Sequence, residues 1–128
     1  FDTRYELGLA GEKCARLIKI LSDNGSMLSG DLRRAGGFGS GGEKGFEGAV
    51  MKLMMWAYVV VERFDYALDR HGKPFGWGVA RYALADGLFG PEITRARYHV
   101  EPAESLRTLA GGCPGFDPSA VEALIQTI

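Results

Sequence analysis

The sequence has few residues that could hold a metal ion or form a disulfide. It contains only two cysteines and two histidines in 128 residues. Cys14 and Cys113 lie far apart and form neither a CxxC pair nor a zinc-binding spacing, and two histidines exclude a histidine-rich metal site. We therefore expect no metal and no other cofactor. Cys14 lies on the apolar stripe of a predicted helix, so we interpret it as a buried thiol.

The sequence also lacks long hydrophobic runs. No apolar run approaches the roughly 20 residues that a membrane-spanning helix needs. No charged stretch followed by an apolar one resembles a signal peptide. We therefore expect no membrane association and a cytoplasmic location. Because the sequence opens with Phe1 rather than Met, we also expect it to be one domain of a parent protein or a trimmed chain.

An excess of positive charge is missing as well. The 15 Lys and Arg residues are balanced by 16 Asp and Glu residues, which gives a net charge of −1. Nucleic-acid-binding domains are often strongly basic, so this balance argues against a large phosphate-binding surface. It allows a small local one, because the distribution of the basic residues decides where phosphate can bind.

Apolar residues at helical spacing predict three helices in the first half of the chain, over residues 11–21, 29–35 and about 41–57. Ser29 is predicted to cap the second helix, with Leu32 and Ala35 facing inward. Glycines dominate residues 36–42, which we interpret as an interhelical turn anchored by Phe38. Ser40 and Glu43 have the spacing of a capping box for the third helix. The predicted buried face of that helix is Phe46, Val50, Leu53, Met54 and Ala57.

The apolar period then changes from 3.6 to 2. Residues 58–68 and 75–83 are predicted to be strands, and the five-residue turn 70–74 joins them as a β-hairpin. Residues 26–28 form a short apolar patch that fits a minimal strand. Pro102 is suited to begin another helix, which ends at Gly111, and a last helix is predicted to follow Asp117.

The order of these elements predicts an α+β fold. Three helices followed by a hairpin indicate a winged helix-turn-helix, with a three-helix core, a β-hairpin wing and additional C-terminal helices. We expect a winged-helix domain over residues 1–90 and a helical extension packed on it over residues 91–128. A generic α+β domain with a hairpin is the alternative.

Basic residues in this fold are candidates for contact with double-stranded DNA. In a helix-turn-helix the third helix enters the major groove, and a basic wing tip fits phosphate. The candidates are Arg33 and Arg34 on the second helix, Lys44 and Lys52 on the third, and Arg70, His71 and Lys73 in the hairpin turn. A solvated turn is the alternative for the last three. The third helix lacks Arg and Asn, which commonly read guanine and adenine.

Other polar and aromatic side chains favour structural roles. Glu62, Arg63, Asp65 and Arg81 lie on the hairpin strands and could form cross-strand charge pairs. Glu62 and Asp65 are three residues apart and should face opposite sides of a regular strand, which argues against a shared acid-base site. The aromatic side chains are interpreted as core or rim packing, and a base-stacking surface is the alternative. They are Trp56, Tyr58, Trp77 and Tyr82.

Two segments resemble a known family. Residues 46–60 and 69–82, followed by Phe89 and Gly90, are similar to bacterial proteins related to the winged-helix DNA alkylation and crosslink glycosylases of the AlkZ-like family. The run Gly-Lys-Pro-Phe-Gly-Trp-Gly-Val-Ala-Arg-Tyr at residues 72–82 is the most distinctive part. The resemblance implies a winged-helix fold. Active members excise damaged bases with a Gln-X-Gln or Gln-X-Asp motif that positions a water, and Met54 and Trp56 occupy the matching positions here.

The sequence therefore favours a non-catalytic winged-helix DNA-binding domain of a glycosylase-related or regulatory protein. Two alternatives stay open. One is a diverged DNA base-excision glycosylase whose catalytic groups differ. The other is a protein-interaction or dimerisation module, possible as a homodimer, that uses Met51 and Met55 as contacts.

Overall fold

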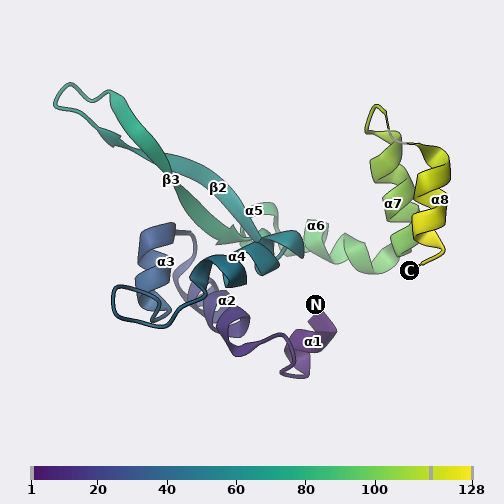
Figure 1. Cartoon of the computed structure of the whole chain (residues 1–128), viewed down its shortest axis with the longest axis horizontal. Coiled ribbons are helices and arrows are strands. Elements are labelled where there is room, and N and C mark those ends of the chain that lie inside the picture. The colour runs from purple at the N-terminus through teal and green to yellow at the C-terminus, as the bar shows by residue number, and fades with distance from the viewer. Residues whose placement is uncertain (1, 116, 128) are drawn as a thin grey trace. The chain divides into compact units, whose positions relative to one another are not determined.

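The computed structural model describes residues 2–115 and 117–127 (Figure 1). The chain divides into two compact units, Phe1–Gly90 and Pro91–Ile128, and each is described by itself. The expectation of a winged-helix domain over residues 1–90 with a helical extension packed on it over residues 91–128 stays a prediction.

The first unit combines helices with a three-stranded antiparallel sheet, so the α+β class is confirmed. Its helices are α1 (Asp2–Glu6), α2 (Glu12–Asn24), α3 (Ser29–Ala35), α4 (Phe46–Met55) and α5 (Ala85–Phe89). Its strands are β1 (Met27–Leu28), β2 (Val59–Leu68) and β3 (Pro74–Leu84), in the order β1-β3-β2. The short strand β1 pairs with β3 through Met27 opposite Tyr82. Helices α2, α3 and α4 lie together at the base of the hairpin, which projects from them (Figure 1).

The loop between α3 and α4 is not helical, and the predicted capping box is wrong. Gly41 and Gly45 have φ angles of 75° and 103°, which right-handed helix does not permit, so α4 begins only at Phe46. The Glu43 carboxylate accepts a hydrogen bond from Arg16 on α2 at 2.9 Å and holds the loop there. The predicted cap of α3 is also wrong, because Ser29 lies inside the helix and makes no capping hydrogen bond.

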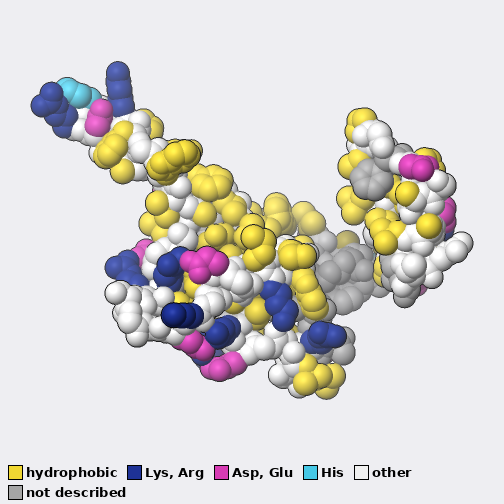
Figure 2. Space-filling model, viewed as in Figure 1, with side chains coloured by type: hydrophobic (Ala, Val, Ile, Leu, Met, Phe, Trp, Pro, Cys, Tyr) yellow, Lys and Arg dark blue, Asp and Glu magenta, His cyan; other side chains and the backbone are white. Residues whose placement is uncertain are grey.

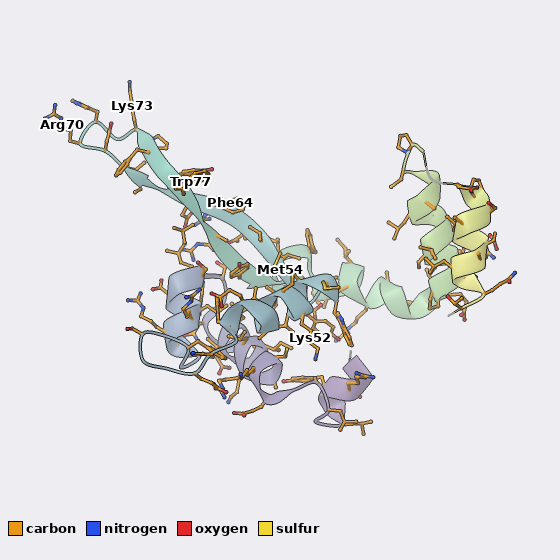
Figure 3. All side chains as sticks on the ribbon, in the orientation of Figure 1. Lys52, Met54, Phe64, Arg70, Lys73 and Trp77 are labelled. Carbon is orange, nitrogen blue, oxygen red and sulfur yellow. The ribbon has the colours of Figure 1, made fainter. Side chains whose placement is uncertain are left out.

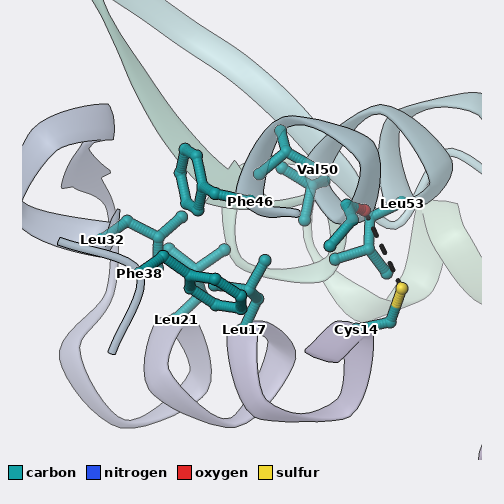
Figure 4. Close-up of a cluster of buried hydrophobic side chains, with 10 residues drawn as sticks. Cys14, Leu17, Leu21, Leu32, Phe38, Phe46, Val50 and Leu53 are labelled. Atoms are coloured by element: carbon teal, nitrogen blue, oxygen red, sulfur yellow. Dashed lines mark hydrogen bonds between the residues drawn. The ribbon is translucent and has the colours of Figure 1, made fainter. Parts of the chain in front are cut away.

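Ten buried residues form the core of the first unit (Figure 4). They come from α2, α3, the glycine-rich loop, α4 and the start of β2: Cys14, Leu17, Leu21, Leu32, Phe38, Phe46, Ala49, Val50, Leu53 and Val59. The expected burial of Cys14 is confirmed, and its thiol lies 3.8 Å from the carbonyl oxygen of Ala49. Phe38 is the anchor that the sequence predicted, and its ring packs against that of Phe46.

The buried face of α4 is narrower than the sequence predicted. Phe46, Ala49, Val50 and Leu53 are buried, whereas Met54 and Ala57 are exposed. The reason is that α4 ends at Met55 and Ala57 adopts a left-handed φ of 58°, which turns the chain into β2. Ala35, also expected to face inward, is exposed on α3.

The second unit consists of short helices. They are α6 (Pro91–Arg95), a 3-10 helix (Ala96–His99), α7 (Pro102–Gly111) and α8 (Pro118–Ile125), of which α7 and α8 were predicted and the first two were not. Arg107 on α7 binds the Glu122 carboxylate on α8 at 2.8 and 3.1 Å. Val121 is the one buried side chain among the described residues of this unit. Within residues 2–115 and 117–127, no helix is long and apolar enough to cross a membrane.

Candidate nucleic-acid interface

The hairpin formed by β2 and β3 is much longer than the sheet that supports it. The two strands pair from Val59 opposite Leu84 to Leu68 opposite Pro74. Strand β1 pairs only with Arg81 and Tyr82 near the base. Beyond that point the hairpin is two-stranded, so its distal half projects from the helical core as an arm (Figure 1).

The turn at the end of the arm is ordered by Asp69. One oxygen of its carboxylate accepts hydrogen bonds from the backbone N–H groups of His71 at 2.8 Å and Lys73 at 2.9 Å. Gly72 takes a φ of 75°, which a glycine adopts without strain. This local arrangement leaves the side chains of Arg70, His71 and Lys73 exposed at the tip (Figures 2 and 3).

The tip cations have no acidic partner among the described residues. Arg70 donates a hydrogen bond from Nε to Nε2 of His71 at 3.1 Å, and this bond neutralises no charge. Lys73 makes no side-chain hydrogen bond or ion pair in the described parts of the chain. Because Asp69 is bound to the turn backbone, Arg70 and Lys73 can present their positive charge outward.

Farther down the arm, charges are paired within the hairpin. Asp65 accepts hydrogen bonds from Nε of Arg63 at 2.8 Å and from Nε of Arg81 at 3.1 Å. The bond from Arg63, and next that from Arg81, lowers the pKa of Asp65 below its ordinary value. Arg81 also reaches the carbonyl oxygen of Ser26 beside β1 at 3.1 Å. The cross-strand pair between Asp65 and Arg81 confirms the structural role predicted for these charges.

Glu62 takes no part in that cluster. It is the extra residue of a β-bulge, between Val61 opposite Tyr82 and Arg63 opposite Arg81. Its Oε2 is buried and has no hydrogen-bond partner among the described residues. Since both oxygens of Asp65 bind arginine, the structure provides no shared carboxylate site for Glu62 and Asp65.

The two arginines of α3 are both engaged in ion pairs. Arg33 pairs with Glu47 on α4, and its guanidinium lies 5.0 Å from the centre of the Phe46 ring. Arg34 pairs with Asp31 one turn earlier on α3. These pairs are exposed, and exposed pairs contribute only about 0–1 kcal/mol, so a phosphate could compete for either arginine. In the free protein, however, their charge is compensated.

The outward side of α4 carries little charge. Lys52 lies on it and has no ion pair with any described residue. Lys44, expected on the same helix, lies instead in the loop before α4. Met51 and Met55 are 60% and 77% exposed. This surface therefore combines one lysine with two methionines.

The structure brings only three of the seven candidate basic residues together. Arg70, His71 and Lys73 share the hairpin tip, and Lys52 lies at the opposite end of the first unit (Figure 3). Arg33 and Arg34 lie on α3. The candidates therefore do not form one continuous basic patch.

Sequence reasoning missed the exposure of the arm's aromatic side chains. Tyr58 and Tyr82 pack against the core as predicted. Trp77, interpreted as core or rim, is 95% exposed, and that interpretation is wrong. The unequal lengths of the strands could have indicated this exposure, because a two-residue strand cannot cover a hairpin of ten- and eleven-residue strands.

A helical core, a three-stranded antiparallel sheet and a projecting hairpin with a cationic tip define an α+β domain. A family model described as AlkZ related matches residues 1–128, and the chain belongs to this AlkZ-related family. No curated protein and no solved structure matches it. The resemblance seen in the sequence is thereby confirmed. Met54 and Trp56, which the resemblance seen in the sequence aligns with the catalytic motif, lie at the end of α4 and directly after it, each 36% exposed.

Proposed function

We propose that residues 1–90 form a winged helix that binds double-stranded DNA without catalysing a reaction on it. Helix α2, strand β1, helices α3 and α4 and the β2–β3 hairpin follow one another in an order that supports this fold. In this proposal α4 faces the major groove and the hairpin is the wing. Membership of the AlkZ-related family supports the same reading.

The observation that carries the proposal is the cationic tip of the arm. Arg70 and Lys73 are exposed, lie close together and have no acidic partner among the described residues. A projecting pair of free cations can reach phosphates that the rest of the surface does not approach. His71 adds a hydrogen-bonding group at the same place.

The side chains of α4 and of the loop before it favour contact with the DNA backbone over reading of base sequence. Lys44 and Lys52 can neutralise phosphates, whereas Met51 and Met55 offer no hydrogen bonds that distinguish base pairs. Few free cations and a net charge of −1 place the expected affinity in the non-specific range, with a Kd of about 10⁻⁴–10⁻⁶ M at physiological salt.

Base excision by the family's catalytic motif does not fit this chain. The Met54 thioether is a weak acceptor and the Trp56 indole is a donor only. Neither side chain offers the oxygen with which an amide accepts a hydrogen bond from a water or a carboxylate takes its proton. We therefore propose binding without glycosidic cleavage, and release of a modified base from damaged duplex by the full chain would contradict it.

Fluorescence anisotropy with a labelled duplex tests the binding. The wild-type chain should bind at low salt, and Lys73→Glu should weaken binding and make the salt slope about one unit shallower. Lys19→Glu is the matched control, since it makes the same charge change at an exposed position of α2. No binding at low salt, or equal effects of the two variants, would overturn the proposal.

A second candidate function is a protein contact through α4. Met51 and Met55 are exposed on its outward side, and methionines suit adaptable protein interfaces. The partner would be a second copy of the chain or another domain of a parent protein. Light scattering after size-exclusion chromatography should then show a dimer that Met55→Lys dissociates, and a wild-type monomer would exclude the homodimer.

A further inference from the structure

The distal arm exposes large aromatic side chains. Phe64, Tyr66 and Trp77 are 56%, 50% and 95% exposed. Hydrophobic side chains cover the arm from its base almost to the basic tip (Figure 2), and Phe64 and Trp77 lie along it between the core and Lys73 (Figure 3).

The packing around Gly78 accounts for the position of the Tyr66 ring. A Cβ at Gly78 would lie 2.8 Å from Cζ of Tyr66 and 2.9 Å from Cβ of Phe64. The missing side chain therefore lets the Tyr66 ring lie across β3. Trp77 precedes Gly78, in a stretch where the pairing of the two strands shifts register between Asp65 and Ala67.

The exposure of these rings on the arm indicates that a ligand covers them. A two-stranded hairpin is only marginally stable by itself, and contiguous exposed apolar surface commonly marks a binding site. The charges beside the rings restrict the ligand. Asp65 is held by two arginines and Asp69 by the turn backbone, whereas Arg70 and Lys73 are free of ion pairs within the described residues.

We propose that Trp77, Phe64 and Tyr66 stack on unpaired bases while the tip holds the neighbouring phosphates. The chain would then prefer DNA that contains a single-stranded gap over intact duplex. This inference rests on the proposed DNA binding and specifies its substrate class. A ligand with both flat apolar rings and negative charge matches the arm, and nucleic acid has both.

The preference follows from the state of the bases before binding. In an intact duplex each base already stacks on its neighbours, so the arm must first unstack a step. In a gap that cost is absent, because the bases are free. One base stacked on one aromatic side chain should change affinity by about 5- to 150-fold.

The two tryptophans of the chain, Trp56 and Trp77, give a direct probe of the contact. In Trp56→Phe, Trp77 is the sole tryptophan, and a duplex with a short thymidine gap should quench its emission more than the intact duplex does. In Trp77→Phe, the emission of Trp56 should respond equally to both probes. Equal quenching of Trp77 by the two probes would count against stacking.

Anisotropy titrations of the full chain with the same two probes complete the test. Trp77→Leu should reduce the preference for the gapped probe by at least about fivefold and leave intact-duplex affinity within about twofold. Leu109→Ala, which removes an exposed apolar side chain from α7, should change neither. Thermal unfolding should show that both variants remain folded.

The outcomes separate this inference from the function on which it rests. If neither probe binds at low salt, the proposed DNA binding fails. If both bind equally and Trp77→Leu changes nothing, DNA binding stands and the stacking proposal is overturned. A chain that self-associates until Trp77→Leu separates it would overturn the proposal in favour of a protein surface.

Discussion

Raising the salt concentration should weaken DNA binding by an amount that the ion pairs of the free protein determine. Arg33 and Arg34 are compensated by Glu47 and Asp31. Four candidate cations have no acidic partner in the described parts of the chain: Lys44, Lys52, Arg70 and Lys73. If only these four neutralise phosphates, the salt dependence should be that of four contacts rather than six.

The difference is large enough to measure. Each neutralised phosphate contributes about −0.9 to the slope of log K against log salt, so four contacts give a slope of about −3.6 and six give about −5.4. Between about 50 and 200 mM salt, affinity should therefore fall roughly 150-fold for four contacts and roughly 2,000-fold for six.

Anisotropy titrations at several NaCl concentrations provide the slope, and two charge-neutralising variants assign it. Lys73→Gln should make the slope shallower by about 0.9, whereas Arg33→Gln should leave it nearly unchanged. A wild-type slope near −5.4, or equal effects of the two variants, would mean that DNA draws Arg33 away from Glu47. In that case the ion pairs of the free protein do not determine the contacts.

Three further predictions concern stability. Leu53→Ala should lower the free energy of unfolding by about 2.7–5 kcal/mol, because Leu53 is fully buried. Met55→Ala, at an exposed position, should lower it by less than about 0.5 kcal/mol. Urea denaturation measures both changes. The pKa of Asp65 is lowered in the folded protein, so its hydrogen bonds stabilise the fold above about pH 4 and are lost as pH falls through the folded-state pKa. Asp65→Asn should therefore be less stable than the wild-type protein at pH 7. The variant should also lose less stability than the wild type between pH 7 and pH 3. Ala57→Gly should raise the thermal unfolding midpoint, because glycine adopts the φ of 58° without a cost of about 1–2 kcal/mol.

Elements whose signal is local were predictable from the sequence. The apolar spacing of α2 and the alternation along the hairpin arise from neighbouring residues, so both appear near the predicted positions. The start of α4 was wrong because two glycines with positive φ, Gly41 and Gly45, hold the preceding loop out of a helix. The spacing of Ser40 and Glu43 carries no information about those backbone angles.

The candidate site was less predictable because its electrostatics depend on contacts between separate elements. Arg33 and Glu47 are distant in sequence and meet only when the fold brings α3 near the start of α4. The exposure of Trp77 depends on how far the hairpin extends beyond the residues that pair with β1. Alternating aromatic residues look the same in a covered strand and in a projecting arm, so their pattern does not distinguish the two. Only the shortness of the predicted strand at residues 26–28 beside two long strands does.

Cations at the tip and aromatic rings along the arm should contribute to binding in separable ways. Salt screens the attraction between Lys73 and phosphate, whereas stacking of Trp77 on a base does not depend on counterion release. Affinity for gapped and intact probes should therefore fall together as salt rises, while their ratio stays nearly constant. A ratio that falls with salt in parallel anisotropy titrations would show that the preference for gaps comes from charge. The aromatic surface would then have no part in choosing the substrate.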